Sequence, residues 1–565
     1  MPPTVSGEDL VRRYEQLDGV RQPYVSLWQD LADYILPRQN AITAQPTPGV
    51  KQTGKQYDTT GERSNQLLAA AMAGTLTSSS SRWFALKMRR SEYNDVKAIT
   101  DWLEDCTDRM FQAFNQSNFS SEIHEVYLSL GAFGTASIFV DEDDVPVRGF
   151  RGLRFTAMPL SEIRIAEDHA GRVDTIFRKF YMTARAVKGR WGSKISKAVS
   201  DKADKHPDEK IALLMAIQPR KGGETKAGAY AKDLPWAACY LEYESKQLLE
   251  EGGYHEWPAP TPRWAKSPGE IYGRGPGHTA LPDIKSLNTA VKLRLKAAAK
   301  HVDPPILVEE DGVLGPVKIS PAALITYRRT SQGKPQPMEM AGRFDWAVMT
   351  EDKLQISIRK IFFADQLQLP EEGPQMTARE IIVRYELMQK ILGPTLGRLE
   401  AELLNPTVER SFAIMFRAGA FAAPPQELLD ALGEEGNEID IVYTGPLALA
   451  QRSQDAMAIE AAIDWAADIA VKAQNPEILE PFDLTEAAYH FSEVRGVPSK
   501  VMRGRELLAK MRAAKEQAAQ EAAAIQKRMA AAEEMQKKAP YLKAVGGAAA
   551  PSPDMPMYSD MAEVA

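Results

Sequence analysis

The sequence predicts a mostly helical α+β protein. Apolar residues recur at helical spacing up to about residue 130, alternate with a period of two between residues 137 and 243, and return to helical spacing from residue 281 onward. The 565 residues are 44% hydrophobic and 26% charged, which is typical of a chain that buries a substantial core.

The N-terminal part is predicted to contain four helices. Ser6 and Asp9 resemble a capping box at the start of the first helix, and Pro23 is expected to break it. Thr59 and Glu62 are expected to cap the second helix. The third and fourth helices would each bury one apolar face, made of Ile99, Trp102, Leu103, Cys106, Met110, Phe111 and Phe114 in the third and of Ile123, Val126, Tyr127 and Leu130 in the fourth.

Short strands should follow, because the apolar period changes to two. We expect an exposed helix and a loop over residues 193–233, which are charged and end in a glycine-rich stretch. The predicted strands cover residues 137–140, 154–158, 164–166, 174–181 and 237–243.

The clearest amphipathic helix spans residues 281–302. Its apolar stripe is Ile284, Leu287, Val291, Leu295 and Ala298, and its opposite face carries Lys285, Lys292, Lys296 and Lys300. In a single amphipathic helix, such lysines more commonly mark the solvated face than a binding surface. Here a small module over residues 303–345 and a second helix follow, which predicts a helical hairpin with a module at its tip. Copies arranged in a ring could turn these lysines toward a central axis and guide duplex DNA without reading its bases.

The C-terminal half is predicted to be helical around one long loop that begins at residue 364. A helix from residue 377 to about 418 should kink at residues 393–394 and 405–406, and further helices are expected at residues 453–473 and 484–495. Residues 499–538 form a last helix, with a thin stripe that suits packing beside a neighbouring helix: Leu508, Met511, Ala518, Ala522, Ile525 and Met529.

Composition and motifs exclude several classes. The net charge of −7 argues against a whole-surface polyanion binder, and two cysteines cannot form a disulfide framework. The seven histidines lack metal-ligand spacing, and no apolar stretch is long enough to span a membrane. The glycine-rich run at residues 273–277 has no Lys-Ser/Thr after it, so we expect a turn into the helix and not a phosphate site. We therefore expect no enzyme, metal or cofactor.

Several fragments, taken in order, resemble the portal or head-to-tail connector proteins of short-tailed bacteriophages. They include EIYGRGP at residues 270–276, ALPDIKSLN at 280–288 and DPP at 303–305. MTARE at 376–380, LGP at 392–394 and GPLA with AQR at 445–452 continue the series. Together with weaker matches they extend from about residue 24 to residue 455.

The resemblance implies a ring, usually of twelve subunits, whose subunits have wing, stem, clip and crown regions around a DNA channel. On this chain the wing would be residues 1–270, with stem helices at 271–302 and 346–363 and the clip at 303–345 between them. A channel loop at 364–376, a kinked long helix returning to the wing at 377–452, a helical crown at 453–538 and a disordered tail at 539–565 would follow. The loop residues expected to face the channel are Gln368, Leu369, Pro370, Glu371, Glu372 and Gly373.

The same resemblance implies the partners. They are other copies of the chain, double-stranded DNA without sequence preference, terminase, tail or adaptor proteins at the clip, and capsid and scaffolding proteins. The expected place is the portal vertex of a virion, assembled in the host cytoplasm and without a membrane. Two alternatives stay open: a helical scaffold or adaptor of a virion that encloses no channel, and a hydrolase or nucleotide enzyme with dispersed residues.

Overall fold

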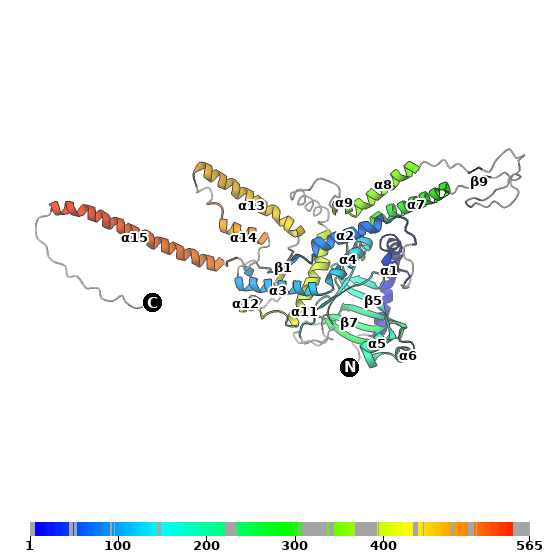
Figure 1. Ribbon diagram of the computed structural model, residues 1–565. Coiled ribbons are helices and arrows are strands. Elements are labelled where there is room, and N and C mark those ends of the chain that lie inside the picture. Colours follow the sequence, from blue (N-terminus) through cyan, green and yellow to red (C-terminus); the bar gives the residue numbers. More distant parts are fainter. Residues whose placement is uncertain are drawn as a thin grey trace.

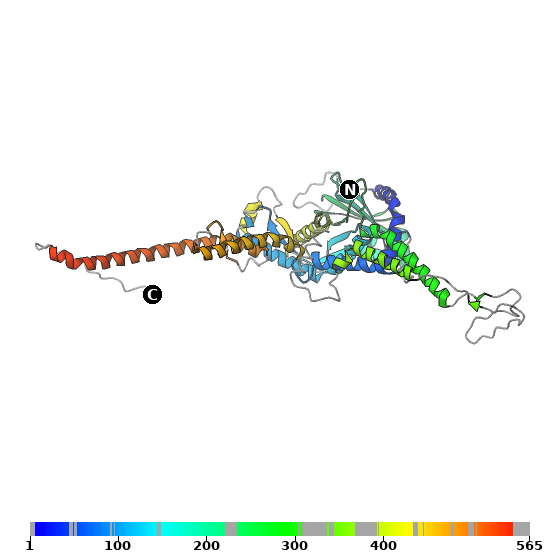
Figure 2. The ribbon, with the colours of Figure 1, turned by 90° about the horizontal axis from the view of Figure 1, so that it is seen from above.

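The computed structural model describes residues 6–43, 49, 54–90, 93–94, 96–143, 149–220, 234–302, 306–307, 336–337, 344–367, 393, 395–432, 439–443, 446–475, 480–494, 502–503 and 505–545. Among these residues helices predominate, and the strands form one five-stranded sheet and three two-stranded pairs, as the predicted α+β class requires. A central body carries α7 and α8 on one side and α13 to α15 on the other (Figures 1 and 2).

The first helix, α1 (Gly7–Ile35), runs through Pro23 without interruption, so the predicted break is wrong. Proline removes one backbone hydrogen bond from a helix interior. Burial on both sides of Pro23 outweighs this loss, because residues 10–17 pack on the sheet and residues 28–36 enter the main core. Ser6 does cap the helix by accepting the amide of Glu8 at 3.3 Å, whereas Asp9 pairs with Arg12.

The second helix, α2 (Thr60–Leu76), follows a short 3-10 turn, η1 (Pro37–Gln39), and begins where predicted. Its cap is Asp58 and not Thr59, which makes no side-chain capping bond. The Oδ1 atom of Asp58 accepts the amide of Thr60 at 2.8 Å. The capping residue therefore lies one position earlier than the sequence suggested.

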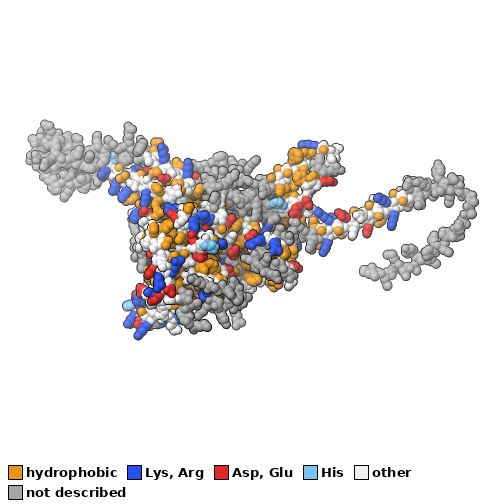
Figure 3. Space-filling model, turned by 180° about the vertical axis from the view of Figure 1, so that it is seen from behind, with side chains coloured by type: hydrophobic (Ala, Val, Ile, Leu, Met, Phe, Trp, Pro, Cys, Tyr) orange, Lys and Arg blue, Asp and Glu red, His pale blue; other side chains and the backbone are white. Residues whose placement is uncertain are grey.

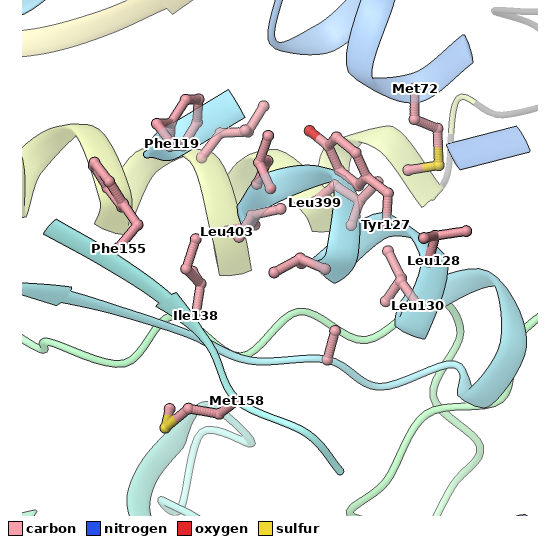
Figure 4. Packing of buried hydrophobic residues seen from close by; sticks show 14 of the residues in the cluster. Met72, Phe119, Tyr127, Leu128, Leu130, Ile138, Phe155, Met158, Leu399 and Leu403 are labelled. Carbon is pink, nitrogen blue, oxygen red and sulfur yellow. The ribbon is translucent and has the colours of Figure 1, made fainter. Parts of the chain in front are cut away.

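The main core is built on α3 (Lys97–Gln116) and α4 (Phe119–Phe133). Every residue predicted for their buried faces is at most 8% exposed. In Figure 4 apolar side chains of α4 lie between α2, the segment before α11 and the β2–β3 hairpin. The labelled side chains of this cluster are Met72, Phe119, Tyr127, Leu128, Leu130, Ile138, Phe155, Met158, Leu399 and Leu403. This cluster joins residues that are more than 300 positions apart in the chain.

The five-stranded sheet is an antiparallel meander in the order β4 (Ile163–Glu167), β5 (Val173–Thr183), β6 (Lys210–Pro219), β7 (Trp236–Glu242) and β8 (Leu248–Tyr254). Strands β4, β5 and β7 lie where strands were predicted. The central strand β6 falls inside residues 193–233, where a helix and a loop were expected, so that prediction is wrong for this part. Residues 211–217 form a nearly unbroken apolar run, which a strand buried on both faces needs and which shows no alternation.

Shorter elements surround the sheet. Two small helices, α5 (Ala184–Trp191) and α6 (Lys197–Lys205), with the 3-10 turn η3 (Gly192–Lys194) between them, form a separate apolar cluster with β6. The hairpin of β2 (Ile138–Glu142) and β3 (Leu153–Ala157) was predicted. The antiparallel pair of β1 (Phe84–Met88) and β11 (Ile439–Tyr443) was not, because its partners are far apart in sequence.

The C-terminal part is helical, as predicted. A π-helical turn, η4 (Glu400–Leu404), leads into α11 (Asn405–Arg417), so the expected irregularity before Pro406 takes the form of a wider helical turn. The last helix continues past residue 538, where the tail was expected to begin. The remaining elements are α12 (Gln426–Leu432), α13 (Pro446–Ala473), α14 (Leu484–Val494) and α15 (Arg505–Val545).

Candidate nucleic-acid interface on the helical hairpin

The predicted pair of helices forms an antiparallel hairpin that extends from the body (Figure 1). Its members are α7 (Pro276–Val302) and α8 (Phe344–Ile361). Near the outer end, Nε of Arg294 lies 2.9 Å from Oε1 of the buried Glu351. Nearer the body, Ser357 donates its hydroxyl to Asp283 at 2.8 Å. The ion pair has one buried partner, and charge-assisted hydrogen bonds of this kind are strong when well aligned. Together with the hydrogen bond from Ser357, it links the two helices.

The glycine-rich run at residues 273–277 attaches the hairpin to the body. A Cβ atom added at Gly273, Gly275 or Gly277 would come within 2.7 Å of a backbone carbonyl oxygen around the C-terminal end of α4. The three glycines therefore allow the start of α7 to approach the end of α4 more closely than any other residue could. This packing accounts for the run as a structural junction.

A buried ion network supports the same junction. Arg263, which precedes α7, pairs with Glu402 of η4 at 2.7 Å and with Glu167 of β4. Lys266 also contacts Glu167, at 2.6 Å. Since breaking a buried charge pair leaves an uncompensated charge, this network fixes the sheet, η4 and the approach to α7 relative to one another. Sequence analysis did not find it, because its members are spread over more than 200 positions.

A second attachment holds the middle of α7. The side chain of Asn288 is 4% exposed, and its Oδ1 atom accepts the amides of Tyr57 at 2.7 Å and of Asp58 at 3.1 Å. The Oδ2 atom of Asp58 accepts a hydrogen bond from Gln355 of α8 at 3.0 Å. We call Asp58, Asn288 and Gln355 the hairpin clamp. It ties both hairpin helices to the start of α2.

The four predicted lysines do not behave as one set. Lys285 forms an ion pair with Asp30 of α1 at 2.6 Å, so its charge stabilises the attachment to the body. The ammonium of Lys292 lies 5.2 Å from the centre of the Tyr57 ring. Lys296 and Lys300 are exposed, and neither forms an ion pair within the described part of the chain. The basic surface on α7 is therefore concentrated in its outer half.

The second helix of the hairpin adds cations that the sequence analysis did not single out. Lys353, Arg359 and Lys360 of α8 are all exposed. Figure 3 shows Lys and Arg side chains over the hairpin, between apolar ones. The lack of a regular spacing of four among them explains why they were overlooked.

Large apolar side chains are also exposed on the outer half of the hairpin. Leu293 of α7 is 59% exposed and Met349 of α8 is 58% exposed. Leu295 and Val348 share this property, and so does Ile356 nearer the body. Leu295 continues the stripe that Ile284 and Val291 bury against the body, so the stripe extends beyond the surface that one subunit can cover.

The other predicted site residues lie outside the described residues. This holds for Gln368, Leu369, Pro370, Glu371, Glu372 and Gly373 of the predicted channel loop. The start of that loop is helical: α9 (Ala364–Leu367) follows α8 after a turn at residues 362–363, and its first residue, Ala364, is buried. Of the predicted clip, the structure describes an antiparallel pair of β9 (Ile306–Leu307) and β10 (Gln336–Pro337).

Within the described ranges, no group of three or more His, Cys, Asp or Glu side chains could hold a metal ion. No helix among those residues combines the length and apolar character that a membrane crossing requires.

Comparison with known proteins places the chain in a family. The family described as bacteriophage head to tail connecting protein matches residues 8–502. The chain belongs to this family. Two curated connector relatives are similar along almost their whole length. The probable portal protein of Bordetella phage BPP-1 is 30% identical over 527 residues, which cover 91% of this chain and 92% of the relative. The portal protein of Salmonella phage epsilon15 is 28% identical over 538 residues, covering 93% and 94%.

Solved structures give a weaker likeness. A chain in the neck of an empty gene transfer agent particle aligns with 74% of this connector protein at a TM-score of 0.36 and 13% identity, and 92% of that chain is covered. A chain in the virion of a native gene transfer agent aligns over the same share at a TM-score of 0.34 and 12% identity, with 91% covered. The family assignment depends on the sequence matches and not on these alignments.

Proposed function

We propose that the chain is a phage portal subunit, whose copies form a ring at one capsid vertex and pass double-stranded DNA inward during packaging and outward during ejection. The observation that carries this proposal is the family match over residues 8–502. The portal proteins of the two phages named above support it, since this chain covers more than nine tenths of each. In this role the chain is a structural component of the virion.

The exposed apolar side chains of the hairpin support a ring. A ring needs two different surfaces on each subunit, because each copy contacts one neighbour on either side. Leu295 lies on the stripe side of α7, whereas Leu293 lies on its far side and Met349 on the outer face of α8. These side chains are 51–59% exposed, so burying the remainder of each contributes roughly 0.8–1.5 kcal/mol, about half of the value for full burial. Neighbouring hairpins standing side by side would cover these residues.

Lys296 and Lys300 support contact with DNA. Both are exposed on the outer half of α7, where the ring would repeat them once in every subunit. Contacts between lysine and phosphate carry no sequence information, which suits a conduit that must pass any sequence. We assign Lys296 and Lys300, with Lys292 beside them, to the wall of the channel. Lys285 would instead attach α7 to the body of the same subunit.

The regional assignment follows the resemblance. Residues 1–270 would form the wing, α7 and α8 the stem, and residues 303–345 between them the clip that meets tail or adaptor proteins. Residues 364–376 would form the channel loop, 377–452 the kinked long helix and the return to the wing, and 453–538 the crown. The ring would have twelve subunits. Terminase, capsid and scaffolding proteins would be further partners, and ATP hydrolysis would belong to terminase.

Negative-stain imaging of the purified full-length chain tests the proposal. A portal subunit should give closed rings with a central hole. The alternative of a helical scaffold or adaptor predicts particles without a hole, and such images would overturn the proposal. Turnover of ATP by the purified chain, in the absence of terminase, would favour an enzyme instead.

A further inference from the structure

The first helix carries charged side chains into its contact with the five-stranded sheet. Steps of three and four residues place one stripe of α1 on a single face: Tyr14, Leu17, Asp18 and Arg21. The first two belong to the apolar cluster between this helix and the sheet, so the whole stripe faces the sheet (Figure 1). Ionisable groups in such a contact need partners of opposite charge, because burying an isolated charge is costly.

The facing side of the sheet adds two more cations. Arg164 of β4 lies opposite Phe177 of β5 in the strand register, and Phe177 belongs to the same apolar cluster as α1. Lys179 follows Phe177 by two positions and therefore lies on the same face of the sheet. The contact between helix and sheet thus contains three cations, Arg21, Arg164 and Lys179, around the carboxylate of Asp18.

This carboxylate is already occupied. The Nε and Nη2 atoms of Arg164 lie 2.8 and 2.7 Å from Oδ1 of Asp18, and its Nη1 atom donates to the carbonyl of Ser161 at 2.7 Å. The Oδ2 atom of Asp18 accepts the side-chain amide of Gln22 at 3.1 Å. Little of the carboxylate therefore remains for the other two cations.

Among the described residues, Arg21 has no partner at an ordinary hydrogen-bond length. It is 3% exposed, and its buried Nε atom has no partner in that part of the chain. Its Nη2 atom lies 3.5 Å from the carbonyl oxygen of Leu160 and its Nη1 atom 3.8 Å from Oδ1 of Asp18, whereas N–H···O bonds usually measure ~2.7–3.2 Å. Burial and repulsion by Arg164 lower the pKa of Arg21 to about 10. The guanidinium therefore lacks an anionic partner.

Lys179 shares this shortage. Its ammonium lies 3.4 Å from the centre of the Tyr243 ring, and it forms no ion pair with any residue that the structure describes. Burial and repulsion by Arg164 lower its pKa as well. Glu15 and Glu244 act on this region only from a distance, because both are exposed and neither forms an ion pair with these cations within the described ranges. Two positive charges are left without a bonded anion.

We propose that a small, doubly charged oxyanion of the phosphate class binds between α1 and the sheet, held by Arg21 and Lys179. Two negative charges balance the two cations, and several oxygens on one centre can accept from a guanidinium and an ammonium at once. Solvent reaches the site, since the side chain of Asp18 is 30% exposed and Lys179 is half-buried. The bound anion would tie α1 to β5. All these groups belong to one subunit, so the inference does not depend on the proposed ring.

A sulfate titration of the full-length protein tests the site, with the unfolding temperature as the readout and sodium chloride keeping the ionic strength constant. Exclusion of sulfate from the protein surface stabilises folded proteins without saturating, whereas binding at a site saturates. The wild-type unfolding temperature should therefore rise along a curve that saturates at millimolar sulfate. Inorganic phosphate should produce the same kind of curve.

Lys179→Met removes one of the two cations at a half-buried position. The affinity for sulfate, taken from the midpoint of the curve, should fall roughly tenfold, as expected for the loss of one charge-assisted hydrogen bond. Lys194→Met is the matched control, because Lys194 is exposed in η3 and should leave the affinity unchanged. A wild-type curve that does not saturate would overturn the inference. So would an unchanged midpoint in Lys179→Met, or an equal loss of affinity in Lys194→Met.

Discussion

The hairpin clamp offers the sharpest test of how the helical hairpin is held on the body. Replacing Asn288 with alanine removes the Oδ1 atom that accepts the backbone amides of Tyr57 and Asp58. It also removes the side-chain amide group, which donates to the carbonyl of Ile284 at 2.9 Å. The two freed amides belong to the loop that caps α2 through Asp58. The expected consequence is local opening of this loop without loss of the fold.

The magnitude follows from the burial of the partners. An unsatisfied buried amide costs about 1–3 kcal/mol, and the lower end applies here because Tyr57 is exposed and water can reach the loop. Two amides at about 1 kcal/mol each give a decrease of about 2 kcal/mol in the free energy of local opening. Since ~1.4 kcal/mol corresponds to a factor of ten, hydrogen exchange in this loop should accelerate roughly thirtyfold.

Hydrogen exchange measured by mass spectrometry on a peptide covering residues 54–60 is the assay. Thr289→Ala is the matched control, because its hydroxyl bonds only to the carbonyl of Lys285 within α7, at 2.8 Å, and it is exposed. Unchanged exchange in Asn288→Ala, or an equal acceleration in Thr289→Ala, would refute the role assigned to the clamp.

Three further changes probe the junction, its histidine and the basic surface. Gly277→Ala places a Cβ 2.4 Å from a carbonyl of α4 and should lower the unfolding temperature by several degrees, whereas Gly189→Ala in α5 meets nothing within 4 Å and should raise it slightly. Burial lowers the pKa of His278 to about 4, so between pH 6.5 and 4 the unfolded chain binds a proton that the folded chain does not, and the free energy of unfolding declines as pH falls through this range. His278→Asn should make the decline of the urea unfolding midpoint with falling pH shallower. An unchanged slope of midpoint against pH would contradict the account. Replacing Lys296 and Lys300 together with glutamine should leave rings intact but reduce DNA retention in filled heads and weaken the salt dependence of duplex binding by rings; normal retention would remove these lysines from the channel wall.

The helical parts of the fold could be predicted because each helix carries its own evidence. The buried faces of α3 and α4 recur at three and four residues, and all of their members are buried. Strand β6 could not be found in this way, because both of its faces are covered. Leu214 and Ala216 pack with residues of α1 on one face, whereas the other face packs on α5, α6 and the main core, so apolar residues do not alternate with polar ones. The pairing of β1 with β11 depends on residues more than 350 positions apart, which no local pattern records.

The candidate interface was predicted in outline and corrected in detail. Spacing alone grouped Lys285 with Lys296 and Lys300, but it could not show that Asp30 of a distant helix lies 2.6 Å from Lys285. The same limit applies to Asp58, whose partners on α7 and α8 are more than 200 residues away. Local spacing identifies which face of a helix is polar, whereas tertiary contacts decide which charges on it are already neutralised.

The central claim is that hairpins of neighbouring subunits stand side by side around a hole that admits a DNA duplex. A three-dimensional reconstruction of the purified assembly tests it most directly, at a resolution that identifies the side chains bordering the hole. The account predicts Lys296 and Lys300 at the rim of the hole, with Leu293 and Met349 buried between neighbours. A hole bordered by other elements, or these apolar residues left in water, would contradict it.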